Sequence, residues 1–101
     1  MSLSSDLKVS LVQTPLHWEN PEENYRYLSD LIRSLDGKTD LVVLPEMFTT
    51  GFSMDSARLA EPLNGPTLGW MAQTAQDLDA VVTGSIIVEE GGNYFNRLIW
   101  M

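Results

Sequence analysis

A short, wholly apolar run at residues 41–44 constrains the fold of this 101-residue chain more than any other feature. Four consecutive apolar residues that end at Pro45 are typical of a strand covered on both faces, as in the middle of a parallel sheet. Parallel strands need a crossover connection, which is usually a helix. We therefore expect a helix on each side of this run.

Two helices are predicted at those places. Asn20, Pro21 and the acids that follow favour a helix start, because Asn caps free N–H groups, Pro suits the first turn and negative charge suits a helix N-terminus. Gly37 is the expected C-terminal cap of this helix. The second helix is predicted from Pro66 or Thr67 to Leu78. The inner faces expected from helical spacing are Leu28, Leu31, Ile32 and Leu35, then Leu68, Met71, Ala72, Ala75 and Leu78.

The remaining apolar segments predict three more strands. Residues 7–13 indicate a first strand that is buried on at least one face, and residues 80–88 a third strand that Gly84 could interrupt. Residues 94–101 follow a short Gly-rich turn and indicate a hairpin partner, whereas residues 53–64 look irregular. This order predicts an α/β fold, a mixed sheet with flanking helices, right-handed crossovers and a late antiparallel pair.

Charge and composition exclude several classes of function. Six Lys and Arg against fourteen Asp and Glu give a net charge of −8, which disfavours nucleic acid and anionic membranes as partners. The chain has no Cys and one His, so disulfides, thiolate metal sites and a Cys nucleophile are excluded within it. No apolar run approaches a membrane span. We expect a cytoplasmic protein, with residues 1–6 a disordered leader or an expression remnant.

Glu46 is the candidate catalytic residue. It directly follows a buried strand and Pro45, at the sheet edge where open α/β folds bind ligands. Met47, Phe48 and Phe52 could wall it as a substrate pocket, although all three would also suit a core. A partly desolvated carboxylate accepts protons more readily, which suits a general base. The alternative is a solvated loop acid or a helix cap.

Four segments together carry a resemblance. Leu-Pro-Glu-Met-Phe-Thr-Thr-Gly-Phe at residues 44–52 resembles the first catalytic motif of the nitrilase, or carbon–nitrogen hydrolase, superfamily, and its omega-amidase-like branch in particular. Residues 8–13 are similar to that superfamily's first strand, residues 82–85 to its third and residues 94–97 to the start of its fourth. Within the last segment, Asn96 and Arg97 are candidates to buttress the active-site end of the sheet. Arg97 could equally pair with a surface acid.

The resemblance implies a reaction and an architecture. Members hydrolyse small carboxylic amides with a Glu, a Lys and a Cys, of which only Glu46 maps onto this chain. Residues 7–101 would be the N-terminal portion, roughly the first third, of a four-layer αββα sandwich that often forms a homodimer. The resemblance implies no metal and no organic cofactor. These residues alone are expected to be inactive, because the Lys and the Cys nucleophile would lie further along.

Three other functions remain open at this point. A metal-dependent phosphoesterase would use Glu46 as a Mg²⁺ ligand. A non-catalytic α/β binding module would need neither Lys nor Cys. A truncated interaction protein would pair through its last strand. An essential Cys in the full-length protein would favour the amidase, and magnesium-dependent activity would favour the phosphoesterase.

Overall fold

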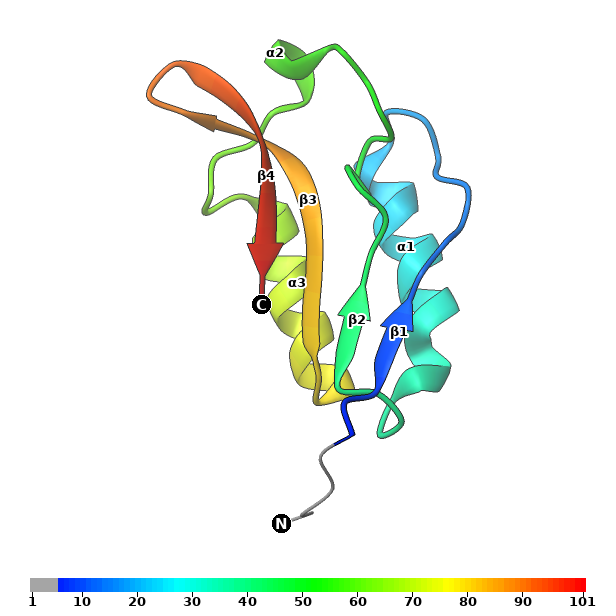
Figure 1. Ribbon diagram of the computed structural model, residues 1–101. Helices are drawn as coiled ribbons and strands as arrows, with labels where there is room; N and C mark the ends of the chain where they lie inside the picture. The colour runs from blue at the N-terminus through cyan, green and yellow to red at the C-terminus, as the bar shows by residue number, and fades with distance from the viewer. Residues whose placement is uncertain (1–5) are drawn as a thin grey trace.

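The computed structural model describes residues 6–101 (Figure 1). The leader expected at residues 1–6 lies outside this range except for its last residue. In chain order the elements are β1 (Val9–Leu11), α1 (Pro21–Ile32), the 3₁₀ turn η1 (Arg33–Leu35), β2 (Leu41–Val43), α2 (Ser56–Leu59), α3 (Pro66–Leu78), β3 (Val81–Glu90) and β4 (Asn93–Trp100).

The strands form one four-stranded sheet in the order β1-β2-β3-β4. Strands β1, β2 and β3 are parallel, and β3 pairs with β4 in an antiparallel hairpin. The apolar run at residues 41–44 therefore supplies an inner strand, as predicted, and Val42 at its centre is fully buried. This mixed sheet with flanking helices confirms the predicted α/β fold.

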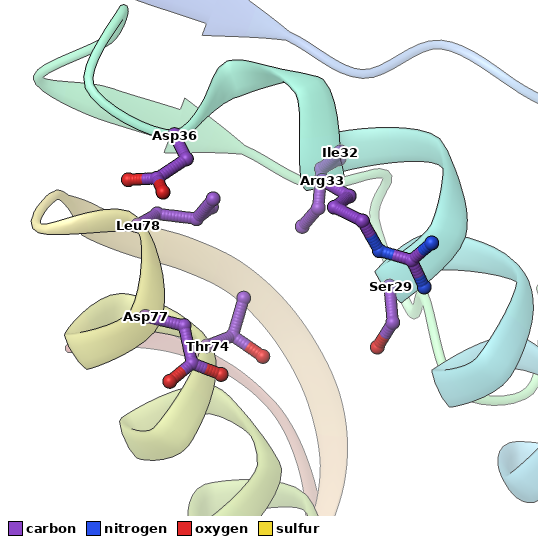
Figure 2. Close-up of a pocket in the computed structure, with 7 residues that line it drawn as sticks. All are labelled: Ser29, Ile32, Arg33, Asp36, Thr74, Asp77 and Leu78. Atoms are coloured by element: carbon purple, nitrogen blue, oxygen red, sulfur yellow. The ribbon is translucent and has the colours of Figure 1, made fainter.

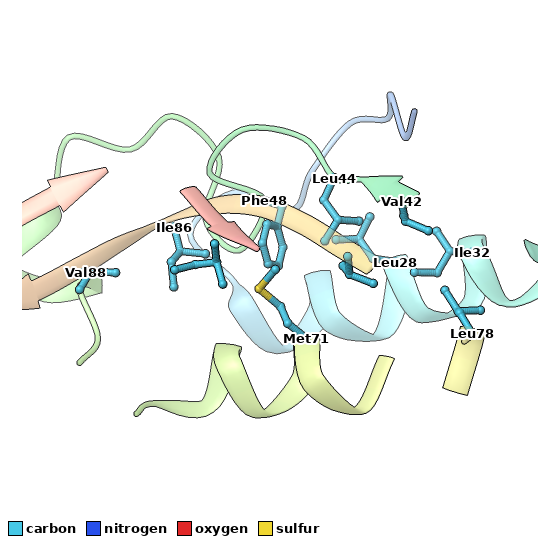
Figure 3. Close-up of a cluster of buried hydrophobic side chains, with 11 residues drawn as sticks. Leu28, Ile32, Val42, Leu44, Phe48, Met71, Leu78, Ile86 and Val88 are labelled. Atoms are coloured by element: carbon cyan, nitrogen blue, oxygen red, sulfur yellow. The ribbon is translucent and has the colours of Figure 1, made fainter. Parts of the chain in front are cut away.

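Both long helices cover the same face of the sheet. Figure 3 shows Leu28 and Ile32 of α1, together with Met71 of α3, packed beneath Val42 and Ile86 of the strands. Asn20 caps α1 as predicted, since its side chain accepts from the N–H of Glu23 over 3.2 Å. The helices are thus held against the sheet by apolar burial.

Phe48 completes this core from the loop after β2. Its side chain is fully buried, and the centroid of its ring lies 5.7 Å from the ring centroid of Trp70. Strand β3 runs without a break through Gly84, so the interruption considered there does not occur. The glycine makes room instead, because a methyl group at Gly84 would lie 2.7 Å from Cδ1 of Phe48. The helix-covered face of β3 is shaped to accept this ring.

The opposite face of the sheet is open. The strand register sets Leu11, Val43, Thr83 and Trp100 in one row on this face. Leu11 is 76% exposed and Trp100 is 65% exposed, and Leu98 beside them is similarly open. Exposed apolar side chains on the outer strands β1 and β4 therefore flank buried Thr83 of β3. Large exposed apolar side chains on one face of a sheet often mark an interaction site.

Several sequence expectations differ from the structure in detail. The first strand is shorter than residues 7–13, and its Val9 and Leu11 are exposed. Leu31 and Ala72 were expected on inner helix faces but are exposed. The reason is that each helix meets the sheet along a narrow stripe, formed in α1 by Asn24, Leu28 and Ile32, and in α3 by Thr67, Met71, Thr74 and Leu78.

Two further points concern the ends and connections of helices. The segment at residues 53–64, expected to be irregular, contains the short helix α2. Gly37 was predicted as the C-terminal cap of the first helix, but α1 is capped by Arg33 and η1 by Asp36, and Gly37 follows them in the left-handed region at φ +74°. Among residues 6–101, no helix combines the length and apolar character that spanning a bilayer requires.

Candidate active site

Glu46 lies on the turn that directly follows β2, at the carboxyl edge of the parallel strands. Strand β3 holds this turn on both sides of the glutamate. Leu44 N–H donates to the Thr83 carbonyl oxygen over 2.8 Å, and Met47 N–H donates to Oγ of Ser85 over 2.9 Å. The backbone around Glu46 is therefore fixed relative to the central strand.

The turn itself is tight and strained. Met47 takes the left-handed region at φ +50°, which few non-glycine residues adopt. Its carbonyl oxygen accepts hydrogen bonds from Thr50 N–H over 3.2 Å and from Gly51 N–H over 2.8 Å. Gly51, at φ +75°, closes the turn at a position where a side chain would be strained. Backbone strain of order 1–3 kcal/mol per residue is most often found at functional sites.

The side chain of Glu46 is exposed, and within residues 6–101 it has one hydrogen-bond partner, Asn96 of β4. Asn96 Nδ2 donates to Glu46 Oε2 over 2.9 Å. The partly desolvated environment that the sequence suggested is not formed by residues 6–101. Phe48 is buried in the core instead of against Glu46, and Phe52 is 66% exposed.

A small pocket of about 160 Å³ lies next to this pair. Asn96 is part of its wall, which places the Glu46 carboxylate near the pocket. The lining residues are Met47, Ser53, Met54, Ser56, Ile87, Tyr94, Phe95 and Asn96. Of the three residues named as pocket candidates from the sequence, Met47 lines this cavity, whereas Phe48 and Phe52 do not.

Figure 2 shows a second pocket, of about 270 Å³, between the C-terminal parts of α1 and α3. It is lined by Ser29, Ile32, Arg33, Asp36, Thr74, Asp77 and Leu78. Both helices end where β2 and β3 begin, so this pocket lies at the amino end of the parallel strands. Glu46 is at the other end, where ligands of such sheets bind. The pocket between α1 and α3 is therefore separate from the Glu46 site.

Asn24 is a site-supporting residue that the sequence reasoning did not identify. It is fully buried on α1, and its Nδ2 donates to the carbonyl oxygens of His17 and Thr49, each over 2.8 Å. Its Oδ1 accepts from His17 N–H over 2.8 Å. One side chain thus joins α1 to the loop after β1 and to the Glu46 loop. The sequence feature that could have identified Asn24 is its position four residues before Leu28, on a helix face that is otherwise apolar.

Glu19 adds a second connection between the same two loops. Its N–H donates to the Thr50 carbonyl oxygen over 2.8 Å, and its carboxylate accepts from Ser53 Oγ and from Arg58, each over 2.5 Å. Hydrogen bonds to Asp55, and then to Glu19, raise the pKa of the Arg58 guanidinium above its usual value. The loops that frame Glu46 therefore behave as one hydrogen-bonded unit.

Metal ligands are not clustered in this part of the chain. Residues 6–101 bring together no group of three His, Asp or Glu side chains that could hold an ion.

Arg97, the other candidate buttress, pairs with Glu90 over 3.2 Å and lies over the Phe95 ring. Asn96 alone of the two residues reaches Glu46.

Residues 8–101 match the family model for carbon-nitrogen hydrolases. The chain belongs to the carbon–nitrogen hydrolase family. Among curated proteins, it is 36% identical to omega-amidase YafV of Yersinia enterocolitica over 94% of this chain, and 33% identical to omega-amidase YafV of Escherichia coli K12 over 92%. In both comparisons the chain spans 36% of the relative's length.

Solved structures of carbon–nitrogen hydrolases have the same arrangement of elements. One is XC1258 from Xanthomonas campestris, a CN-hydrolase superfamily protein with an arsenic adduct in the active site. It is 42% identical to this chain with a TM-score of 0.91, and the match covers 96% of this chain and 37% of the XC1258 chain. The carbon–nitrogen hydrolase of Helicobacter pylori, at 17% identity and a TM-score of 0.80, covers 93% and 35% and shares the fold. The family resemblance seen in the sequence is thereby confirmed.

Proposed function

We propose that the full-length protein hydrolyses a small carboxylic amide, of the omega-amide type, to an acid and ammonia, with Glu46 as general base. The observation that carries the proposal is the position of Glu46 on a strained turn, clamped by β3, beside a small pocket. The chain's membership of the carbon–nitrogen hydrolase family and its similarity to proteins named omega-amidases support this reaction class.

The chemistry requires two groups from outside residues 1–101. This chain has no Cys, so the nucleophilic thiol must come from the rest of the protein, as must the Lys that stabilises the oxyanion. As the thiol sulfur attacks the amide carbon, Glu46 takes the thiol proton and passes it to the departing nitrogen. Glu46 then takes a proton from the water that hydrolyses the thioester and returns it to the sulfur. Residues 1–101 alone are inactive in this scheme.

The open face of the sheet supports a proposal for where the rest of the protein packs. We propose that residues 7–101 form the N-terminal portion of a four-layer αββα sandwich, in which a second sheet covers Leu11, Leu98 and Trp100. Two sheets packed face to face lie about 10 Å apart, so the second sheet would also bring its loops to the carboxyl edge near Glu46. That approach would supply the desolvation that residues 6–101 do not. The complete protein is proposed to form a homodimer.

The test is ammonia release from a panel of small amides by the full-length protein. Glu46→Gln removes the base without changing the size of the side chain, and we expect its kcat to fall about 10²–10⁴-fold. Glu22→Gln, on the exposed first turn of α1, is the matched control and should retain wild-type rates. Wild-type rates in Glu46→Gln would refute the proposal. So would amide hydrolysis by residues 1–101 alone.

A further inference from the structure

Asn96 and Glu46 lie fifty residues apart in the sequence and meet through one hydrogen bond of 2.9 Å. We propose that Asn96 is a positioning residue, whose amide N–H holds Oε2 of Glu46 and leaves Oε1 to accept and return the proton. This inference rests on the proposed function, because it concerns how the base is aimed. Within residues 6–101, Oε1 accepts no hydrogen bond, so it is the oxygen available to a substrate or a thiol.

The backbones of both residues are attached to the same strand. Asn96 is paired with Ile87 of β3, and the turn that carries Glu46 is bound to Ser85 of β3 two residues earlier. Since Ser85 and Ile87 are two apart, they lie on the same face of the strand, which is the open face. The spacing between Asn96 and Glu46 is therefore set by β3.

An asparagine suits this task for chemical reasons. Its amide donates a hydrogen bond but neither takes up nor releases a proton near neutral pH, so it orients the carboxylate without competing for the proton. An aspartate would set a second negative charge beside the first, and a lysine would neutralise the base. A hydrogen bond to a charged acceptor is stronger and shorter than a neutral one, and so it restrains the carboxylate rotamer.

Within residues 6–101 the hydrogen bond contributes little to folding. Both side chains are exposed, and exposed charge-assisted contacts generally add little to stability. Removing the Asn96 amide should therefore leave the fold of these residues intact, and thermal unfolding of the full-length Asn96→Ala variant beside wild type measures its effect on the whole protein. A loss of rate without a loss of stability separates a positioning role from a structural one.

The experiment is kinetic and uses the full-length protein. We expect Asn96→Ala to lower kcat about 10–100-fold, as for a misaligned catalytic group, with KM changed less than about twofold. Asn96→Gln keeps the amide on a longer side chain and should recover part of the loss. Asn93→Ala, an exposed Asn on the same strand, is the control and should match wild type. An Asn96→Ala variant with wild-type kcat would overturn the inference.

A double-mutant cycle separates this inference from the proposed function. If Asn96 acts through Glu46, Asn96→Ala should have no further effect on kcat in the Glu46→Gln background. Independent, multiplicative losses would overturn the positioning role while leaving the base in place. Wild-type activity in Glu46→Gln alone would instead overturn the proposed function, and the role of Asn96 with it.

Discussion

The side-chain amide of Asn24 on α1 donates a buried hydrogen bond of 2.8 Å to the carbonyl oxygen of Thr49 in the Glu46 loop. The same amide also binds His17 O, and so a single residue inside a helix fixes two loops at the carboxyl edge of the sheet. The loops are not shaped by their own sequences alone. The helix that packs under them determines where they lie.

We expect Asn24→Ala to lower the unfolding free energy of the chain by about 2–4 kcal/mol, because it leaves buried backbone groups without partners. Urea denaturation followed by circular dichroism measures this loss. Asn93→Ala, at an exposed position, should change stability by less than about 0.5 kcal/mol. Equal values for the two variants would show that the Asn24 hydrogen bonds do not stabilise the loops.

Gly84→Ala should destabilise the chain by about 1–3 kcal/mol, since its methyl group would overlap the Phe48 ring and crowd Cβ of Leu44. Phe48→Leu in the same chain should remove part of this cost, giving a non-additive pair in thermal unfolding. Gly69→Ala is the control. It lies in α3 with nothing within 4 Å of the added methyl group, and it should stabilise the chain by about 0.5–1 kcal/mol. A neutral Gly84→Ala would contradict the close packing of the Phe48 ring against Gly84.

We expect the free energy of unfolding to depend on pH through the hydroxyl group of Tyr25. Burial raises the pKa of its hydroxyl above the ordinary 10.0, although the hydrogen bond to Thr67 acts in the opposite sense. Because the folded chain binds this proton more tightly than the unfolded chain, the contribution is complete below pH 10 and is lost as pH rises through the folded pKa. The advantage of wild type over Tyr25→Phe in unfolding free energy should therefore shrink above pH 10. An advantage that grows with pH would contradict this assignment.

The open sheet face should promote self-association of residues 1–101 when they are made alone. Leu11→Lys with Leu98→Lys places charge on this face, and we expect weaker association in sedimentation experiments. Ala57→Lys, at an exposed position on α2, is the control and should not change association. In the full-length protein, the double variant should be destabilising, because a second sheet is proposed to cover the face. Unchanged stability there would argue against that covering.

The order of elements could be predicted because the periodicities in the sequence are local and strong. The run at residues 41–44 and the capped start at Asn20 each determine an element without reference to distant residues. The position of Glu46 followed from the end of that strand, and the motif around it identified the family.

The environment of Glu46 was less predictable, because it depends on residues far away in the sequence. Phe48 and Phe52 have equal apolarity in the motif, yet one is buried beside Gly84 and the other faces solvent. Only the packing of β3 decides between them. Asn24 likewise reads as an ordinary helix residue until the two loops that it binds are placed.

The β3–β4 hairpin turns at Gly91 and Gly92, both with positive φ, at +62° and +82°. Positive φ at both central residues is the geometry of a two-residue turn that matches strand twist, and it sets how β4 aligns with β3. Sliding one strand past the other by a single residue would flip Asn96 to the helical side. Two residues without side chains, at the tip of a hairpin, thus select which β4 side chain can reach the carboxylate.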